Sequence, residues 1–185
     1  TGLRPNKNRF KSFRTRMDED ADDVLTIGEW FKSNDYFTLS LGKISHHTND
    51  SPESWSIPAW RGEKNWRDYQ TKENIFAAKT KNGAAKAFEI GENLNDDYGD
   101  TKMVNKAIEK LDELTVKEQP FFMALGFLKP HLPFNAPKKY WDLYNEKDIE
   151  LASNRYQPKN SPDISMHKYG AVSYTHLTLP TMRLV

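Results

Sequence analysis

Two short stretches of the sequence place lysine close to histidine. The first holds Lys43 followed by His46 and His47, and the second holds Lys129 and His131 on either side of a proline. A lysine ammonium is a compact positive charge, and an imidazole gains or loses its proton near neutral pH. These groups suit an oxyanion such as sulfate or phosphate, because lysine neutralises non-bridging oxygens and protonated histidine can donate a proton to a leaving oxygen.

Other chemistry is restricted by what the two stretches lack. The chain has no cysteine, which excludes disulfides, thiolate zinc sites and a cysteine nucleophile within it. Neither stretch has a nearby aspartate or glutamate at metal-ligand spacing, so the sequence predicts no metal site in this chain. A single Lys-x-x-His pattern is most often a pair of surface residues, and that interpretation stays open for each stretch taken alone.

A predicted strand precedes each stretch. Helical spacing from Val24 to Phe31 predicts a helix capped by Asp22 or Asp23, and Tyr36–Leu41 is typical of a strand that follows it. Phe121–Phe127 is apolar on both faces, as in a central parallel strand covered by helices. Ligands of open α/β sheets bind beyond the carboxyl ends of the strands, so the two Lys/His loops form one site hypothesis.

The remaining predicted elements are shorter or less regular. Asp100 or Thr101 caps a helix that runs to about Val116 and carries one apolar stripe. Lys86–Ile90 predicts a short strand, and Lys138–Tyr144 a short helix that starts near a proline. Residues 48–83 are polar and irregular, and their tryptophans anchor a long loop or, alternatively, stack on a ligand. The stripe comprises Val104, Ala107, Ile108, Leu111 and Leu114, the proline is Pro137, and the tryptophans are Trp55, Trp60 and Trp66.

Composition limits the partners of the chain. Its 185 residues contain 27 Lys plus Arg and 26 Asp plus Glu, a net charge of +1 that gives no general case for nucleic acid or an anionic membrane. Apolar residues make up 37%, against roughly 45–50% in a complete globular domain, so we expect folded material that is short of core. No run approaches the length of a transmembrane helix, and the first residues do not resemble a signal peptide. Basic residues from Arg4 to Arg16 are a solvated surface or, alternatively, a cationic approach to an anionic substrate.

The motifs at these stretches resemble those of the formylglycine-dependent type I sulfatases, in the iduronate-2-sulfatase-like branch. They occur in the family's order and at compatible spacing over residues 1–163. The G-K-x-x-H and K-P-H-L-P-F strings are specific when taken together. The matching segments are residues 1–5 (TGLRP), 41–46 (LGKISH), 50–56 (DSPESWS), 120–127 (PFFMALGF), 129–134 (KPHLPF) and 136–144 (APKKYWDLY).

The resemblance implies a role for each candidate site residue. Lys43 would contact the sulfate and the catalytic formylglycine, and His46 would hydrogen-bond the formylglycine hydroxyl and help to break down its sulfate ester. His131 would bind sulfate and assist the leaving alcohol. Lys129 would lie near the substrate, and His47 has no clear counterpart. The implied fold is the alkaline-phosphatase-like α/β sandwich, with a mixed, mostly parallel sheet flanked by helices and incomplete at both ends of this chain.

The resemblance also implies that parts of the site lie outside this chain. Thr1 and Gly2 match the end of the family's C-x-P-S-R motif, so the cysteine that becomes formylglycine would precede residue 1. The Ca²⁺ ligands would come from segments further upstream and downstream. We therefore expect residues 1–171 to be part of the N-terminal catalytic domain of an exported enzyme of periplasmic, extracellular or lysosomal type. That enzyme would hydrolyse sulfate esters of a sulfated glycan, and this chain alone is expected to be inactive.

Two alternatives and one exclusion complete the prediction. A phosphatase or phosphodiesterase of the same superfamily would share the sheet and the oxyanion chemistry. A non-catalytic remnant that binds sulfated glycans would use Lys43, the basic N-terminal residues and the tryptophan-bearing loop. Residues 172–181 (VSYTHLTLPT) resemble a translated sequencing-library adapter, so residues 172–185 are expected to be a non-native tail and His176 is excluded from the site.

Overall fold

Two apolar segments pair as parallel strands in the computed structural model of the chain. Strand β1 (Phe37–Gly42) lies beside β3 (Phe121–Gly126), in a register that runs from Phe37 opposite Phe121 to Gly42 opposite Gly126. Aromatic and other apolar residues dominate both segments and favour a pleated, half-buried backbone. The two strands predicted from the sequence are therefore confirmed, and their direction is parallel. Within the described residues β3 pairs with β1 and is half-buried, so it is not the covered central strand that its apolar sequence predicts.

The structure describes residues 1–62, 66–80, 85–92, 98–150, 153 and 159–162. The chain divides into two compact units, Thr1–Asp68 with Asp97–Lys129 and Tyr69–Asp96 with Pro130–Val185. The predicted tail, residues 172–185 with His176, lies outside the described residues. None of the helices in the described part is long and apolar enough to cross a membrane.

A further segment of the first unit runs along the other edge of β1. The Ser56 amide donates to the Thr38 carbonyl at 2.8 Å, and the Trp60 amide donates to the Ser40 carbonyl at 3.0 Å. The Trp60 carbonyl in turn accepts from the Gly42 amide at 2.8 Å. Residues 56–60, predicted as irregular loop, therefore extend the sheet. The prediction missed this because the pairing uses backbone atoms, which leave little trace in the side-chain pattern.

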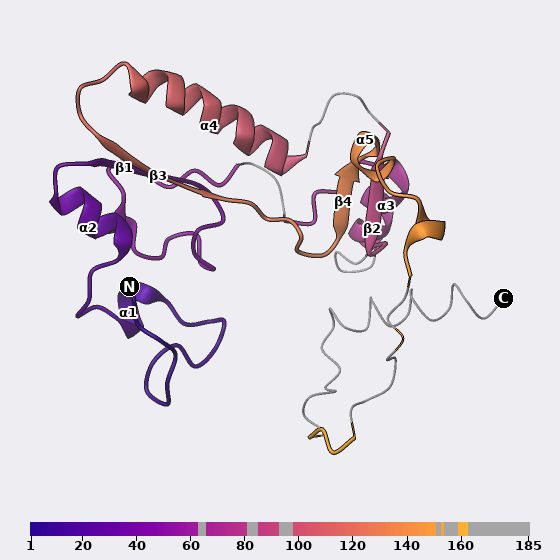
Figure 1. The fold of residues 1–185 in the computed structure, drawn as a ribbon, viewed down its shortest axis with the longest axis horizontal. Coiled ribbons are helices and arrows are strands. Elements are labelled where there is room, and N and C mark those ends of the chain that lie inside the picture. The colour runs from indigo at the N-terminus through magenta and orange to yellow at the C-terminus, as the bar shows by residue number, and fades with distance from the viewer. Residues whose placement is uncertain (63–65, 81–84, 93–97, 151–152, 154–158, 163–185) are drawn as a thin grey trace. The chain divides into compact units, whose positions relative to one another are not determined.

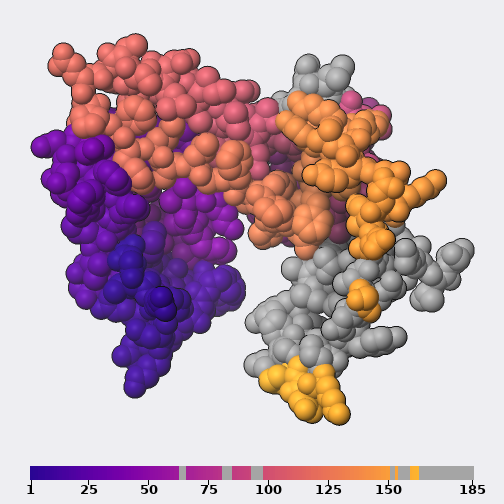
Figure 2. Space-filling view, in the orientation of Figure 1, coloured from indigo at the N-terminus to yellow at the C-terminus, as the bar shows by residue number. Residues whose placement is uncertain are grey.

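Helix α4 (Gly99–Thr115) packs against the strand pair of the same unit (Figure 1). Its Met103 and Ala107 form a buried cluster with Leu41, and Trp60 and Met123 pack against that cluster. In the space-filling view the atoms of α4 form an unbroken flank of this unit (Figure 2). The tryptophan at position 60 thus anchors its loop to the core.

The predicted apolar stripe of α4 is only partly correct. Ala107 and Leu114 are buried as expected, whereas Ile108 is 52% exposed and Leu111 is 37% exposed. Met103, which lies outside the predicted stripe, is buried instead. The face that contacts β1 is therefore rotated about the helix axis toward Met103.

The predicted cap of α4 is also wrong. Tyr98 occupies the N-cap position without a side-chain cap, so neither Asp100 nor Thr101 starts the helix. The Asp68 carboxylate accepts the Gly99 N–H. An amide that the helix itself leaves without a partner is thus satisfied by a side chain from a distant segment.

Helix α2 (Ile27–Ser33) starts later than predicted, and its cap is neither Asp22 nor Asp23. Thr26 Oγ1 accepts the Glu29 N–H at 3.1 Å, and the Glu29 carboxylate accepts the Thr26 N–H at 2.7 Å. This reciprocal capping box satisfies two amides at once, which a single aspartate cap does not do.

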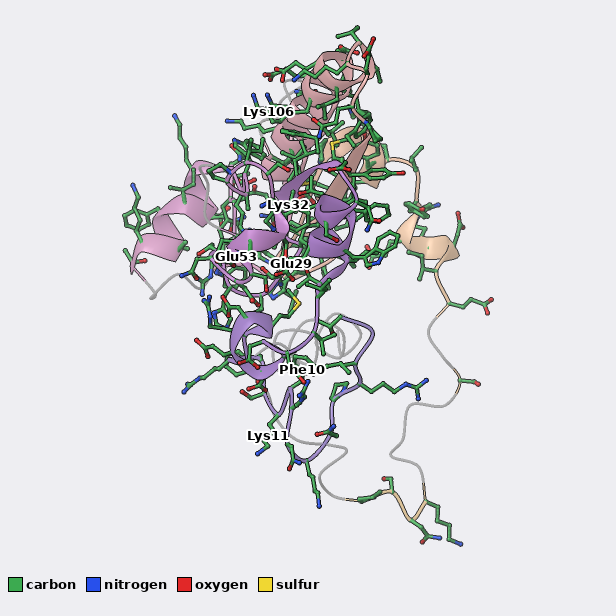
Figure 3. The ribbon with its side chains drawn as sticks, turned by 90° about the vertical axis from the view of Figure 1, so that its left-hand side faces the viewer. Phe10, Lys11, Glu29, Lys32, Glu53 and Lys106 are labelled. Carbon is green, nitrogen blue, oxygen red and sulfur yellow. The ribbon has the colours of Figure 1, made fainter. Side chains whose placement is uncertain are left out.

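Aromatic stacking fixes α2 on the strand pair. Phe31 lies parallel to Phe122 with ring centroids 4.4 Å apart, and Trp55 stacks beside Phe122 at 6.4 Å. Lys32 Nζ donates to the Glu53 carbonyl of η1 (Pro52–Ser54) at 2.9 Å. Figure 3 labels both residues on the ribbon. Trp55 is therefore a packing residue, as predicted for the loop tryptophans.

The second unit contains a second parallel pair, β2 (Phe88–Gly91) with β4 (Phe134–Pro137). Its helices are α3 (Lys72–Thr80), α5 (Lys138–Trp141) and the single turn η2 (Glu146–Asp148). The strand predicted at residues 86–90 is confirmed with a small shift. The helix predicted at residues 138–144 ends at 141 and has its proline at the N-cap position, and neither β4 nor α3 was predicted.

Glu89 on β2 binds the residues at the start of α3, the helix that the sequence analysis did not predict. This carboxylate is 2% exposed and accepts the amides of Gln70 and Thr71, the Thr71 hydroxyl and the Asn74 side-chain amide. Burial by itself raises the pKa of Glu89, but these hydrogen bonds outweigh it and hold the pKa below its ordinary value. The start of α3 therefore depends on a charged group on β2.

Two glycines face each other where β1 and β3 end. A Cβ on Gly126 would overlap the Lys43 carbonyl oxygen, and a Cβ on Gly42 would overlap the Gly126 oxygen and the Met103 sulfur. Gly42 also has φ +76°, a conformation that favours glycine. The backbones that leave the two strands can approach this closely only because neither residue carries a side chain.

Replacement of Gly126 by alanine is expected to lower the free energy of unfolding by about 1–3 kcal/mol, because the added methyl group meets rigid backbone. Urea unfolding measures the change. Gly99→Ala is the matched control, since its methyl group would meet only the Asp68 carboxylate oxygen, at 3.3 Å. Equal stabilities of the Gly126→Ala variant and the parent protein would contradict the close approach.

Glu89→Gln is expected to cost about 1–3 kcal/mol at pH 7, because a neutral amide cannot accept from all four donors. The pKa of Glu89 is lower in the folded protein than in the unfolded chain. Its stabilisation is thus complete above the unfolded pKa of about 4.3 and is lost as pH falls through the folded pKa. The difference between the unfolding free energies of parent and variant, measured with urea, should narrow as pH falls from 7 to 3, and a difference that does not change with pH would refute this role.

Candidate active site

Lys43 is the first residue beyond β1, at the carboxyl end of the strand pair. Its amide donates to the Gly126 carbonyl at 2.7 Å, and its side chain is half-buried. The positive φ of Gly42 turns the chain out of the strand just before it. The backbone of Lys43 is thus fixed to the ends of both β1 and β3, as the sequence predicts for a residue at this edge of a parallel sheet.

The loop that follows Lys43 holds its own backbone with side chains. Ser45 Oγ donates to the His47 carbonyl at 2.6 Å, and His47 Nε2 donates to the Arg14 carbonyl at 2.9 Å. His46 is exposed and makes edge-on ring contacts with Phe13 at 5.6 Å and with His47 at 5.2 Å. His46 therefore lies on an anchored loop with its imidazole at the surface of this unit.

Arg61 contacts the same loop and was not predicted as a site residue. Its Nη2 donates to the Ser45 carbonyl at 2.8 Å, to Ser45 Oγ at 2.9 Å and to the His47 carbonyl at 2.8 Å. Burial lowers the pKa of Arg61, and the Asp50 carboxylate acts in the opposite direction. The one sequence feature that could have indicated a role for Arg61 is its position directly after Trp60, in a loop with several tryptophans.

Asp100 holds the start of the second loop. Its carboxylate accepts the amides of Leu128 and Lys129, each at 3.1 Å, from the first turn of α4. Predicted as a helix cap, Asp100 instead links α4 to the residues that follow β3. The backbone of Lys129 is thereby fixed within the first unit, and its side chain is half-buried.

His131 belongs to the second unit, where it is exposed. Its Nδ1 donates to the Leu132 carbonyl at 2.6 Å, so this nitrogen carries a proton. The structure thus brings Lys43, His46 and Lys129 to one unit, at the end of the β1–β3 pair. A common site that also includes His131 stays a prediction.

Two of the six basic residues from Arg4 to Arg16 form ion pairs with neighbouring carboxylates. Arg9 forms an ion pair with Asp23 at 2.7 Å, and Arg16 pairs with Asp18 and Glu19. The hydrogen bond from Arg16 holds the pKa of Asp18 below its ordinary value. For Arg9 and Arg16 these contacts favour a solvated, internally paired surface over a cationic approach to substrate, and for the other four basic residues both interpretations stay open.

Asp50 is a buried carboxylate next to the first loop, and its role is structural. It accepts the amides of Met17 and Asp18 at 2.9 and 3.2 Å, at the start of α1 (Met17–Asp20), and the Ser51 hydroxyl at 2.9 Å. Within the described residues no group of three or more His, Cys, Asp or Glu side chains could hold a metal ion.

Comparison of the sequence with known proteins identifies the family of this chain. The sequence model of the family described as Sulfatase matches residues 1–175. Iduronate 2-sulfatase of Homo sapiens is 30% identical over 180 residues, which cover 91% of this chain and 32% of that protein. The Mus musculus iduronate 2-sulfatase is 29% identical with the same coverage, and a sulfatase of Formosa agariphila is 28% identical over 89% of this chain and 34% of its own length. The match spans nearly the whole chain and includes both Lys/His loops, so the chain belongs to the sulfatase family.

Proposed function

We propose that this chain is part of a sulfatase that hydrolyses sulfate esters of a sulfated carbohydrate. The chain spans about a third of the length of the curated relatives it matches, so the activity is assigned to the longer protein that contains it. The observation that carries the proposal is the position of Lys43, with its backbone fixed to the ends of two parallel strands and His46 on the anchored loop beyond it. Export to a periplasmic, extracellular or lysosomal-type compartment belongs to the same proposal and rests on resemblance alone.

The side chains at this edge would act on the sulfate group directly. The Lys43 ammonium would neutralise a non-bridging oxygen, an attraction of about 1–4 kcal/mol at 4 Å between the limits of water and a protein surface. His46 would hydrogen-bond the sulfate group from the adjacent loop. Lys129 would contribute a second positive charge to substrate binding.

His131 is the proposed proton donor to the leaving alcohol. Its Nδ1 proton is held by the Leu132 carbonyl, so transfer would use Nε2 of the protonated ring. A positioned general acid of this kind typically contributes about 10²–10⁴-fold to rate. The proposal requires that the second unit bring His131 to the same sulfate that Lys43 binds.

Sulfatases generally use a formylglycine residue and a metal ion, and the residues of this chain do not fit either group. The sequence has no cysteine from which formylglycine could form. The described part of the chain contains no group of three or more metal-ligating side chains. In the proposed enzyme both the formylglycine and the Ca²⁺ ligands would come from other segments.

In the full-length protein, Lys43→Ala, His46→Ala and His131→Ala should each lower kcat/KM for an aryl sulfate by about 10²-fold or more. Lys129→Ala should mainly raise KM. His47→Gln is the matched control, because it removes an imidazole from the same loop, and the hydrogen bond of that ring in the described structure is to a backbone carbonyl. Steady-state kinetics at neutral pH measure all five variants.

Assays of the full-length protein with further substrates test the two alternative functions, a phosphatase or phosphodiesterase and a non-catalytic glycan-binding protein. Turnover of an aryl phosphate monoester or diester in preference to the aryl sulfate would show a phosphatase or phosphodiesterase of the same superfamily. Binding of sulfated oligosaccharide without turnover, which survives Lys43→Ala and His131→Ala, would show a non-catalytic glycan-binding protein. Either result would reject the sulfatase assignment.

The 185-residue chain by itself is expected to show no sulfatase turnover, because it contains no C/S-x-P-x-R motif whose cysteine or serine could become formylglycine. The purified chain is assayed beside the full-length protein with the same aryl sulfate. A chain purified in parallel with Lys43→Ala reports any contaminating enzyme. Turnover that exceeds this control would refute the requirement for an upstream nucleophile.

A further inference from the structure

We propose that Arg61 is a positioning residue that fixes His46 for its role in sulfate-ester hydrolysis. The inference rests on the proposed function of His46. Arg61 lies in the stretch between residues 48 and 83, contacts the loop through backbone and serine oxygens, and is not assigned a role by the resemblance or by the sequence pattern.

The contacts of Arg61 bracket His46. One guanidinium nitrogen, Nη2, donates to the carbonyl oxygen of Ser45 and to that of His47, both at 2.8 Å. These carbonyls belong to the residues immediately before and after His46. When the peptide groups on both sides of a residue are held, the direction of its Cα–Cβ bond is held as well.

The Ser45 hydroxyl completes the arrangement. It donates its hydrogen to the His47 carbonyl at 2.6 Å and accepts from Arg61 Nη2 at 2.9 Å. Nη2 has two hydrogens for three acceptor oxygens, so at least one hydrogen is shared. The loop from Ser45 to His47 is therefore closed by a small network that has Arg61 as its positively charged centre.

The position of Arg61 is itself determined by the sheet. The preceding residue, Trp60, is bonded to β1 through its amide and its carbonyl, and its ring packs on the core cluster of Leu41 and Met103. Lys43 and the loop leave the carboxyl end of the same strand. The segment that ends at Arg61 therefore ties the loop back to the strand from which it starts.

Stability alone does not account for an arginine at this position. Arg61 Nε is buried and has no hydrogen-bond partner in the described structure, and burial lowers the pKa of the side chain. An apolar side chain of similar size would avoid the cost of desolvating a charge. The ring contacts of His46 with Phe13 and His47 are edge contacts at the surface, so the backbone contacts are the principal constraint on its position.

The test uses the full-length protein with Arg61→Met, Arg61→Lys and, as a charge-matched control, Lys110→Met. Lys110 lies on α4 in the same unit and pairs with Glu113. Arg61→Met should lower kcat for an aryl sulfate about 10- to 100-fold with little change in KM, because a misplaced group costs up to about 10²-fold. Arg61→Lys should restore part of that loss, and Lys110→Met should leave kcat unchanged.

A double variant separates positioning from a general structural role. In a His46→Ala background, Arg61→Met should change kcat by less than about threefold, because groups that act as one unit have non-additive effects. Equal losses in the presence and absence of His46 would overturn the inference. If His46→Ala itself leaves kcat unchanged, the proposed function of His46 fails, and the inference fails with it.

Backbone ¹⁵N order parameters of residues 45–47 provide a readout independent of activity. They should be lower in Arg61→Met than in the parent protein and unchanged in Lys110→Met. Unchanged order parameters in a folded Arg61→Met protein would overturn the inference whatever its kinetics. If Arg61→Met does not fold, the same comparison is made with Arg61→Lys, for which lowered order parameters together with parental kcat would also overturn it.

Discussion

The hydrogen bonds along both edges of β1 hold together the segments that carry the first unit's part of the candidate site. On one edge the strand pairs with β3, which leads to Lys129, and on the other it pairs with residues 56–60, which lead to Arg61. Beyond its carboxyl end lie Lys43 and the loop of His46. Three segments that are distant in sequence thus reach one edge of the sheet through contacts with a single strand, in keeping with the alkaline-phosphatase-like α/β fold that sulfatase membership implies.

Much of this frame could be predicted from the sequence. The apolar runs at residues 36–41 and 121–127 predicted both strands. The Gly-Lys sequence after the first run predicted that the strand ends just before Lys43, as it does in the structure. The contacts that could not be predicted are hydrogen bonds between main-chain atoms and hydrogen bonds made by charged side chains far away in the sequence. Residues 56–60 bond β1 through main-chain atoms, and Arg61 binds carbonyl oxygens, which every residue possesses. His131 lies in the other unit, and a site shared with Lys43 stays a prediction.

Distant carboxylates also explain why helix starts were predicted poorly. Asp50 accepts the first amides of α1, Glu89 those at the start of α3, and Asp68 that of Gly99 in α4. In each case the acceptor lies far along the chain from the helix it caps. The cap of α2 is local, since Thr26 and Glu29 form a capping box, although the prediction chose Asp22 or Asp23 instead. A capping rule that searches the few residues before a helix fails where tertiary structure supplies the acceptor, which couples the helix to the packing of its unit.

The ion pairs of Arg9 and Arg16 affect the electrostatic potential of the chain at long range. Each pair of opposite charges behaves as a dipole, whose potential falls off faster with distance than that of an isolated charge. With a formal net charge of +1, the chain projects little long-range field into solution. Attraction of an anion by these paired arginines would therefore be a short-range effect, felt within a Debye length of about 8 Å at physiological ionic strength.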